Sequence, residues 1–144
     1  MIREATAEDF HAVMRLYRQL HVDDPVLEER ADRKVFDEIV SSSTLHLMVL
    51  EQEGAVAATA YLNIIPNLTR SASPYAVIEN VVVDDTLRGA GLGKQLMAAT
   101  LDAAWNAGCY KAMLMTGSKR SSTLGFYRTC GFSADEKAAF VAHP

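Results

Sequence analysis

The chain has 144 residues, 49% hydrophobic and 22% charged, as is ordinary for one globular domain over residues 1–144. Its formal net charge of −4 argues against sequence-independent binding to nucleic acid. The chain has no apolar run of membrane-spanning length, and Met1-Ile2-Arg3-Glu4 lacks a signal peptide's apolar core, so we expect a cytoplasmic protein without membrane partners. The two cysteines and four scattered histidines predict neither a disulfide framework nor a metal site.

Hydrophobic periodicity predicts alternating strands and helices along the chain. Thr6 and Asp9 resemble a capping box that begins the first helix, and Ser121 or Ser122 can cap the last one. Gly108 stands just after the expected C-terminus of a helix, where a residue in the left-handed backbone conformation is common. The loop 67–74 carries Arg70. In chain order we predict a strand at 2–5, helices reaching Leu20 and over 27–40, strands at 45–50, 55–65 and 75–83, a helix from Leu92 to Ala107, a strand at 110–115, a short helix ending at Gly131 and a last strand within 132–141.

The stretch from Ile78 to Ala107 organises the rest of the chain. It begins with a buried strand, continues into a turn that contains Gly89, Gly91 and Gly93, and ends in an amphipathic helix. Glycines in such a turn let the backbone approach a ligand closely, and the first N–H groups of the following helix suit an anionic phosphate. We call residues 88–94 the glycine corner and predict that it binds a phosphate.

The spacing of these glycines excludes two common phosphate-binding motifs. A dinucleotide fingerprint requires G-x-G-x-x-G, and a P-loop requires glycine where Arg88 stands and a hydroxyl residue where Gln95 stands. The remaining pattern, R-x-x-G-x-G between a strand and a helix, resembles the acetyl-coenzyme A binding segment of the GCN5-related N-acetyltransferases (GNAT). The predicted order of elements also resembles that family over nearly the whole chain.

This resemblance implies an α/β (α+β) fold with a single GNAT-type domain. Its mixed, mostly antiparallel sheet would have six or seven strands, helices on both faces and splayed central strands, between which the cofactor's pantetheine arm lies in the family. For residues 88–94, the alternative to cofactor binding is a tight turn that binds no ligand, with Arg88 as a solvated surface charge. The implied cofactor is acetyl-CoA, and the implied contacts are Val81, Val82, Val83, Arg88, Gly89, Ala90, Gly91, Leu92, Gly93, Lys94, Thr123 and Tyr127.

Two residues are candidates for proton transfer in such a reaction. Glu79 interrupts an apolar strand and could act as the general base, although a carboxylate there could also point to solvent. Gly125 to Phe132 resembles the family's F-Y-x-x-x-G-F segment, which implies that Tyr127 reprotonates the departing thiolate; the alternative is a core aromatic. Asn80 could orient the substrate or hydrogen-bond a bulge in the strand.

Within the family, Ile78 to Val83 resembles the I-E-D-V-V-V strand of glucosamine-6-phosphate N-acetyltransferases, and Cys109-Tyr110-Lys111 recurs before their next strand. The resemblance implies a small-molecule amine acceptor, an amino-sugar phosphate being one candidate, contacted by Glu79, Asn80 and Arg70. Lys119 and Arg120 are further loop cations that could meet an anion. Acetylation of protein lysines or N-terminal amines, and acyl-CoA binding without catalysis, are alternatives. The family also implies a homodimer, sometimes formed by exchange of C-terminal strands.

Overall fold

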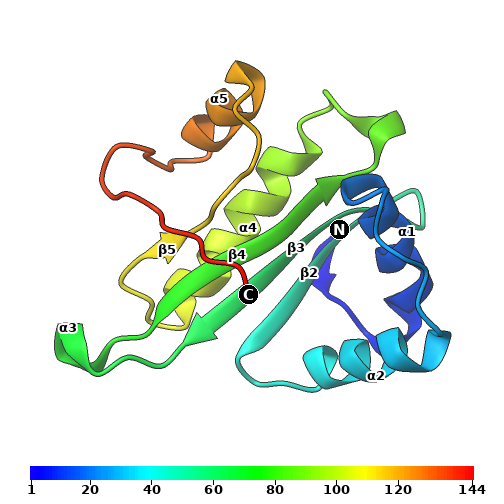
Figure 1. Cartoon of the computed structure of the whole chain (residues 1–144), viewed down its shortest axis with the longest axis horizontal. Coiled ribbons are helices and arrows are strands. Elements are labelled where there is room, and N and C mark those ends of the chain that lie inside the picture. Colours follow the sequence, from blue (N-terminus) through cyan, green and yellow to red (C-terminus); the bar gives the residue numbers. More distant parts are fainter.

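The computed structural model describes the whole chain, residues 1–144, apart from the side chain of Glu29. Five strands form one sheet in the order β1-β2-β3-β4-β5 (Figure 1). Strands β1 to β4 pair antiparallel, and β5 pairs parallel to β4. The elements are β1 Ile2–Glu4, the 3-10 turn η1 Ala7–Asp9, α1 Phe10–Leu20, α2 Glu29–Val40, β2 Leu45–Gln52, β3 Ala55–Ile65, α3 Thr69–Ala72, β4 Tyr75–Val83, the 3-10 turn η2 Asp85–Leu87, α4 Leu92–Asn106, β5 Ala112–Met113 and α5 Ser121–Thr129.

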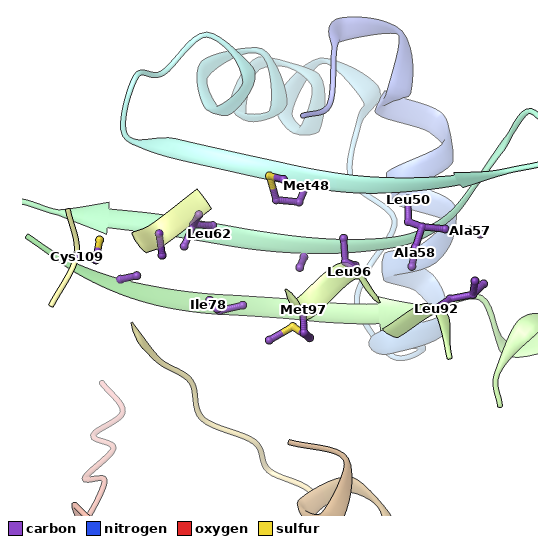
Figure 2. Packing of buried hydrophobic residues seen from close by; sticks show 13 residues of the cluster. Met48, Leu50, Ala57, Ala58, Leu62, Ile78, Leu92, Leu96, Met97 and Cys109 are labelled. Carbon is purple, nitrogen blue, oxygen red and sulfur yellow. The ribbon is translucent and has the colours of Figure 1, made fainter. Parts of the chain in front are cut away.

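Helices cover both faces of the sheet, as predicted, and each face has its own hydrophobic cluster (Figure 1). On one face, Leu92, Leu96 and Met97 of α4 pack over β3 and β4, as Figure 2 shows. On the other face, Val13 and Leu16 of α1 are fully buried against the sheet. The two faces are therefore sealed by different helices, and β4 contributes side chains to both.

A bulge interrupts β4 in its middle. Tyr61 pairs with Glu79 and Thr59 pairs with Val82, so β4 has one residue more than β3 between these pairs. Asn80 takes the left-handed backbone conformation there, with φ of +51°. Because side chains alternate along a strand, the extra residue reverses which side chains face α4. Accordingly Ile78 lies in the α4 cluster, whereas Val82 lies in the α1 cluster.

The last part of the chain differs from the prediction. The sheet has five strands, not six or seven, and residues 132–144 form neither helix nor strand. A strand exists only where a neighbouring edge accepts its hydrogen bonds, and β5, predicted over 110–115, pairs with β4 only at Ala112 and Met113. The outer edge of β5 is therefore too short for residues 132–141 to build a further strand on it.

Two local predictions also need correction. The loop 67–74 contains a turn in which Arg70, Ser71 and Ala72 all have positive φ, held by hydrogen bonds from the Asn67 amide. The N-cap residue of α5 is Arg120, and no serine side chain caps the helix. By contrast, the Thr6 N–H does donate to the Asp9 carboxylate at 2.7 Å.

Candidate active site

The glycine corner joins η2 to helix α4 and is open to solvent at Gly89 and Gly91. Gly89 and Gly91 have φ of +86° and +80°, a backbone conformation that other residues adopt only at a cost. A Cβ atom at either position would meet no atom within 4 Å, so neither glycine is packed against a neighbouring side chain. These two residues shape the turn and leave its surface free for a ligand.

Gly93 serves a different purpose in the same corner. It is buried, and a Cβ atom there would lie 3.1 Å from the Phe126 ring and 3.3 Å from Val83 Cγ2. The absence of a side chain thus lets α4 approach both α5 and the end of β4. This close packing fixes the start of α4 beside the strand that precedes it.

The first turn of α4 fits an anion. Gly91, at the N-cap position, has no side chain to cap the helix, and the first backbone bond of the helix runs from Gln95 N–H to Gly91 O at 3.2 Å. The N–H groups of Leu92, Gly93 and Lys94 therefore point outward at the positive end of the helix dipole. The first turn contains no acidic residue. These are donors suited to the diphosphate of coenzyme A.

Two basic side chains flank the corner. Arg88 is exposed, and its Nε donates to the Val83 carbonyl at 3.4 Å, which bends the side chain back over the end of β4. Lys94 is also exposed. Both residues can reach an anion at the corner, so the predicted phosphate contacts remain compatible with their positions.

Strands β4 and β5 separate beside the corner, as the resemblance implied. Their pairing ends at Val77 and Met113, whereas β4 continues to Val83. Over residues 78–83 the edge of β4 that faces β5 has no strand beside it among the described residues. Backbone groups along such an edge can hydrogen-bond an extended ligand as an added strand would.

A cavity of about 690 Å³ lies where the two strands separate. It brings together β4, β5, α4, α5 and the segment after α5. Both predicted proton-transfer residues, Glu79 and Tyr127, are in its wall. Val77, Lys111, Met113 and the segment 136–140 also line it.

The two proton-transfer candidates are electrostatically coupled. Burial raises the pKa of the Tyr127 hydroxyl, and the charges of Cys130 and Glu79 raise it further. The ring is held between Phe126 and Phe132, whose centroids lie 5.1 and 6.2 Å away. Tyr127 therefore keeps its proton at neutral pH and is fixed in orientation, as a proton donor must be.

Asn80 lies between Glu79 and Val81 in the bulge of β4. Burial raises the pKa of the Tyr17 hydroxyl on α1 to about 12, and the Asn80 side chain opposes part of this shift. The predicted contact of Asn80 with substrate stays a prediction.

Two other predicted contacts lie outside the cavity wall. The hydroxyls of Thr123 and Ser118 are 3.1 Å apart, which links α5 to the loop before it. The Arg70 guanidinium lies over the ring of Tyr110, 5.7 Å from its centroid, at the far end of β4 from the glycine corner. Their predicted roles in binding cofactor and substrate remain untested.

The sequence prediction missed Lys111 as a residue of the cavity wall. Its ammonium lies 5.5 Å from the ring centroid of Tyr75 and 5.3 Å from that of Tyr110. Among the described side chains it has no carboxylate partner within ion-pair distance. The sequence signal for this residue was a lysine within the predicted strand 110–115. The prediction considered only cations in loops as contacts for an anionic substrate.

Among the side chains described, no three His, Cys, Asp or Glu residues gather as metal ligands would. The helices formed by the described residues are all too short or too polar to traverse a lipid bilayer.

Known proteins resemble this chain in sequence and in fold. The model of the acetyltransferase (GNAT) family matches residues 7–132. A glucosamine 6-phosphate N-acetyltransferase of Arabidopsis thaliana is 36% identical over 123 residues, which is 83% of this chain and 80% of the relative. The enzyme of the same name from Trypanosoma brucei brucei is 40% identical over 84 residues, 58% of this chain and only 55% of its own length. A solved structure from Agrobacterium tumefaciens str. C58 superposes with a TM-score of 0.93 at 36% identity and covers 99% of both chains.

Proposed function

Because the chain belongs to the GNAT family of acetyl-CoA-dependent N-acetyltransferases, we propose that it acetylates the primary amine of a small anionic molecule of the amino-sugar phosphate class. The observation that carries this proposal is that Glu79 and Tyr127 line one cavity where β4 and β5 separate. The names of the two curated relatives support the acceptor class.

In the proposed reaction the amine attacks directly, so that an N–C bond forms as the C–S bond breaks. When bound, acetyl-CoA supplies the thioester carbonyl. Glu79 takes the proton that the amine loses, and the Val81 N–H donates a hydrogen bond to the carbonyl oxygen. Tyr127 gives its proton to the departing sulfur. The N–H groups of the glycine corner hold the diphosphate, and the free edge of β4 orients the pantetheine arm.

Lys111 is the cation that we assign to the anionic end of the acceptor. It adjoins Ala112, which pairs with Ala76, so its backbone lies beside Tyr75, four residues or roughly 13 Å of strand from Glu79. Lys111 and Glu79 both line the cavity. An acceptor of amino-sugar size can then offer its amine to Glu79 and its phosphate to Lys111. Arg70, which contacts Tyr110 as Lys111 does, is the second proposed cation.

The proposal also includes assembly and location. We propose a cytoplasmic homodimer in which the exposed side chains of Phe140 and Val141 are covered by the second copy. Sedimentation at several protein concentrations tests this, and a monomer throughout the micromolar range contradicts it.

The deciding experiment is a screen for thiol release from acetyl-CoA. Its arms are phosphorylated amino sugars, the same sugars without phosphate, polyamines and lysine peptides. We expect turnover with the phosphorylated sugars. Fastest turnover with peptides would instead indicate a protein acetyltransferase. Calorimetric binding of acetyl-CoA without turnover in any arm would indicate a non-catalytic acyl-CoA-binding protein.

Substitutions then test the individual roles. Glu79→Gln and Tyr127→Phe should each lower kcat by about 10²-fold or more, while coenzyme A binding measured by calorimetry stays unchanged. Lys111→Ala should raise KM for the phosphorylated sugar about tenfold, since it loses a charge-assisted contact. The matched control is Lys119→Ala, because Lys119 is exposed and is not in the cavity wall. Equal effects of the two lysine variants would contradict the role of Lys111.

A further inference from the structure

The turn that leads from β4 into the glycine corner is held by a set of hydrogen bonds. It consists of residues 84–87, and the backbone N–H of each of them donates to an acceptor. The N–H of Asp84 donates to the carbonyl of Ala57 on β3 at 2.8 Å. The N–H groups of Thr86 and Leu87 both return to Asp84, to its carboxylate at 3.1 Å and to its carbonyl at 2.9 Å. Asp84 therefore organises the turn that ends where the corner begins.

The carboxylate of Asp84 needs a cation to stay in this place. Asp84 is only 8% exposed. Its Oδ1 accepts from the N–H and the hydroxyl of Thr86 at 3.1 and 2.8 Å, and its Oδ2 accepts from Nη1 of Arg15 on α1. Withdrawing a carboxylate from water is costly unless a counter-ion and hydrogen bonds offset the loss. Arg15 therefore supplies the charge that allows Asp84 to form the turn.

A second contact from α1 reaches the same turn. Gln19 lies one helical turn after Arg15, and its side-chain oxygen accepts a hydrogen bond from the Asp85 N–H at 2.9 Å. Arg15 is itself fixed, because its Nη2 donates to the Val56 carbonyl at 2.9 Å. Helix α1 packs beside β4 (Figure 1), and its Leu16 is completely buried. The two polar side chains thus join the turn to a helix that cannot shift without disturbing the core.

The glycine corner depends on this turn for its direction. Residues 88–91 are exposed, and two of these four are glycines. Leu87 before them and Leu92 after them pack with the α4 cluster. The course of the chain as it enters the corner is therefore set by residues 84–87. A small change there would displace the N–H groups that we propose for the diphosphate.

We propose that Arg15 and Gln19 are positioning residues for coenzyme A: from α1 they hold the turn 84–87, and thereby the N–H groups of the glycine corner, in the arrangement that receives the diphosphate. This inference rests on the role proposed above for the glycine corner. Both side chains act through the turn and are assigned no contact with the cofactor. A purely structural role would lower the stability of the fold without a selective effect on coenzyme A.

Calorimetry with coenzyme A tests the proposal in folded variants. Arg15→Met keeps a long side chain but removes the guanidinium, and Gln19→Ala removes the other contact. We expect the Kd for coenzyme A to rise about tenfold in Arg15→Met and by a smaller factor in Gln19→Ala, because each change loosens a preorganised site. Arg15→Lys should restore part of the affinity, since lysine keeps the charge but not the fork that also reaches Val56. The matched control is Arg18→Met, because Arg18 is exposed on the same helix and forms no ion pair with a described carboxylate.

Steady-state kinetics distinguish positioning from general damage. In Arg15→Met, KM for acetyl-CoA should rise about tenfold, while KM for the amine stays within about twofold. Equal rises in both KM values, or the same rise in Arg18→Met, would overturn the proposal. So would an unchanged Kd for coenzyme A in both Arg15→Met and Gln19→Ala. Circular dichroism and thermal unfolding confirm that each variant is folded.

A double-mutant cycle tests whether Arg15 acts through Asp84. The combination of Arg15→Met with Asp84→Asn should bind coenzyme A no more weakly than the weaker single variant, since both changes break the same link. Losses that multiply in the double variant would show that the two side chains act independently, which contradicts the proposed route through the turn.

A measurement without ligand keeps this inference separate from the proposed function. Amide hydrogen exchange should accelerate at Asp85 in Gln19→Ala and at Thr86 in Arg15→Met, because each N–H loses a fixed acceptor, while exchange within β3 stays unchanged. Unchanged exchange at both positions contradicts the proposal. If the parent chain binds coenzyme A and the variants bind it equally well, this inference fails and the proposed function stands. If the parent chain does not bind coenzyme A, the proposed function fails, and the exchange result still decides whether α1 holds the turn.

Discussion

The region from β3 to α4 and the segment after α5 differ in how they are held. In the first, β3 and β4 pair along most of their length and α4 seals one face, so that Leu96 is completely buried. In the second, residues 132–144 carry apolar side chains without a pairing strand, and Phe140 is 93% exposed. Similar hydrophobicity therefore leads to core in one region and to surface in the other, because burial depends on the partners that the fold provides.

Electrostatic contacts follow the same division. Among the described side chains, the ion pairs all lie within residues 3–84. Arg3 on β1 joins Asp9 of η1 and Glu51 of β2, and Arg15 on α1 joins Asp84 after β4. The cavity beside β5 is therefore lined both by residues of the 3–84 region, which contains these ion pairs, and by later residues, which contain none among the described side chains.

The largest expected difference is in core packing. Leu96→Ala should lower the free energy of unfolding by about 2–5 kcal/mol, because it leaves a cavity under α4. In the monomer, Phe140→Ala should change it by less than about 0.5 kcal/mol, because the ring is exposed in the single chain. Urea denaturation of both variants measures the contrast. A loss above about 2 kcal/mol for Phe140→Ala would contradict its exposure.

The next largest loss of stability is expected at the close contact of Gly93 with Phe126 and Val83, at the start of α4. Gly93→Ala should lower the free energy of unfolding by about 1–3 kcal/mol, because the new Cβ would crowd the Phe126 ring and Val83. The control is Gly117→Ala, where a Cβ meets nothing within 4 Å. Chemical denaturation compares the two, and calorimetry with coenzyme A should show weaker binding only for Gly93→Ala. Equal stability of the two variants would refute the packing role.

Acid should loosen the α1 side of the molecule first. The hydrogen bonds from Arg3 lower the pKa of Asp9, so its stabilising contribution is present above the unfolded-state value of about 3.9 and is lost as pH falls through the lower folded-state pKa. Asp9→Asn should therefore destabilise the protein at pH 7 and reduce the loss of stability between pH 4 and pH 2. Thermal unfolding across that range provides the measurement. Parallel curves for parent and variant would contradict this linkage.

The smallest effect is expected from two glycines outside the corner. Gly125→Ala should stabilise the protein by about 0.5–1 kcal/mol, because the site is helical and has room for a methyl group. Gly108→Ala should destabilise it by about 1 kcal/mol, because Gly108 has φ of +84° after α4. Opposite shifts in the thermal midpoints of the two variants would support both assignments, and shifts of the same sign would contradict one of them.

Much of the fold could be predicted because its patterns are local. The bounds of β3 and β4 follow from apolar runs ended by Pro66 and by Asp84-Asp85, and the end of α4 follows from Gly108. The glycine corner could be predicted as well, since glycine adopts the positive-φ conformations found at residues 89 and 91 without steric cost. The last strand could not, because strand formation depends on an edge elsewhere in the fold.

Within the candidate site, the sequence by itself identified the residues that we propose for the chemistry: Glu79 in an apolar strand, Tyr127 in its aromatic segment and the glycines before α4. Only the tertiary structure decided which of them meet. It brought Glu79 and Tyr127 to one cavity and added Lys111 to its wall. The physical reason is that backbone conformation and side-chain chemistry belong to each residue, whereas proximity across a sheet depends on register, and one extra residue in β4 changes it.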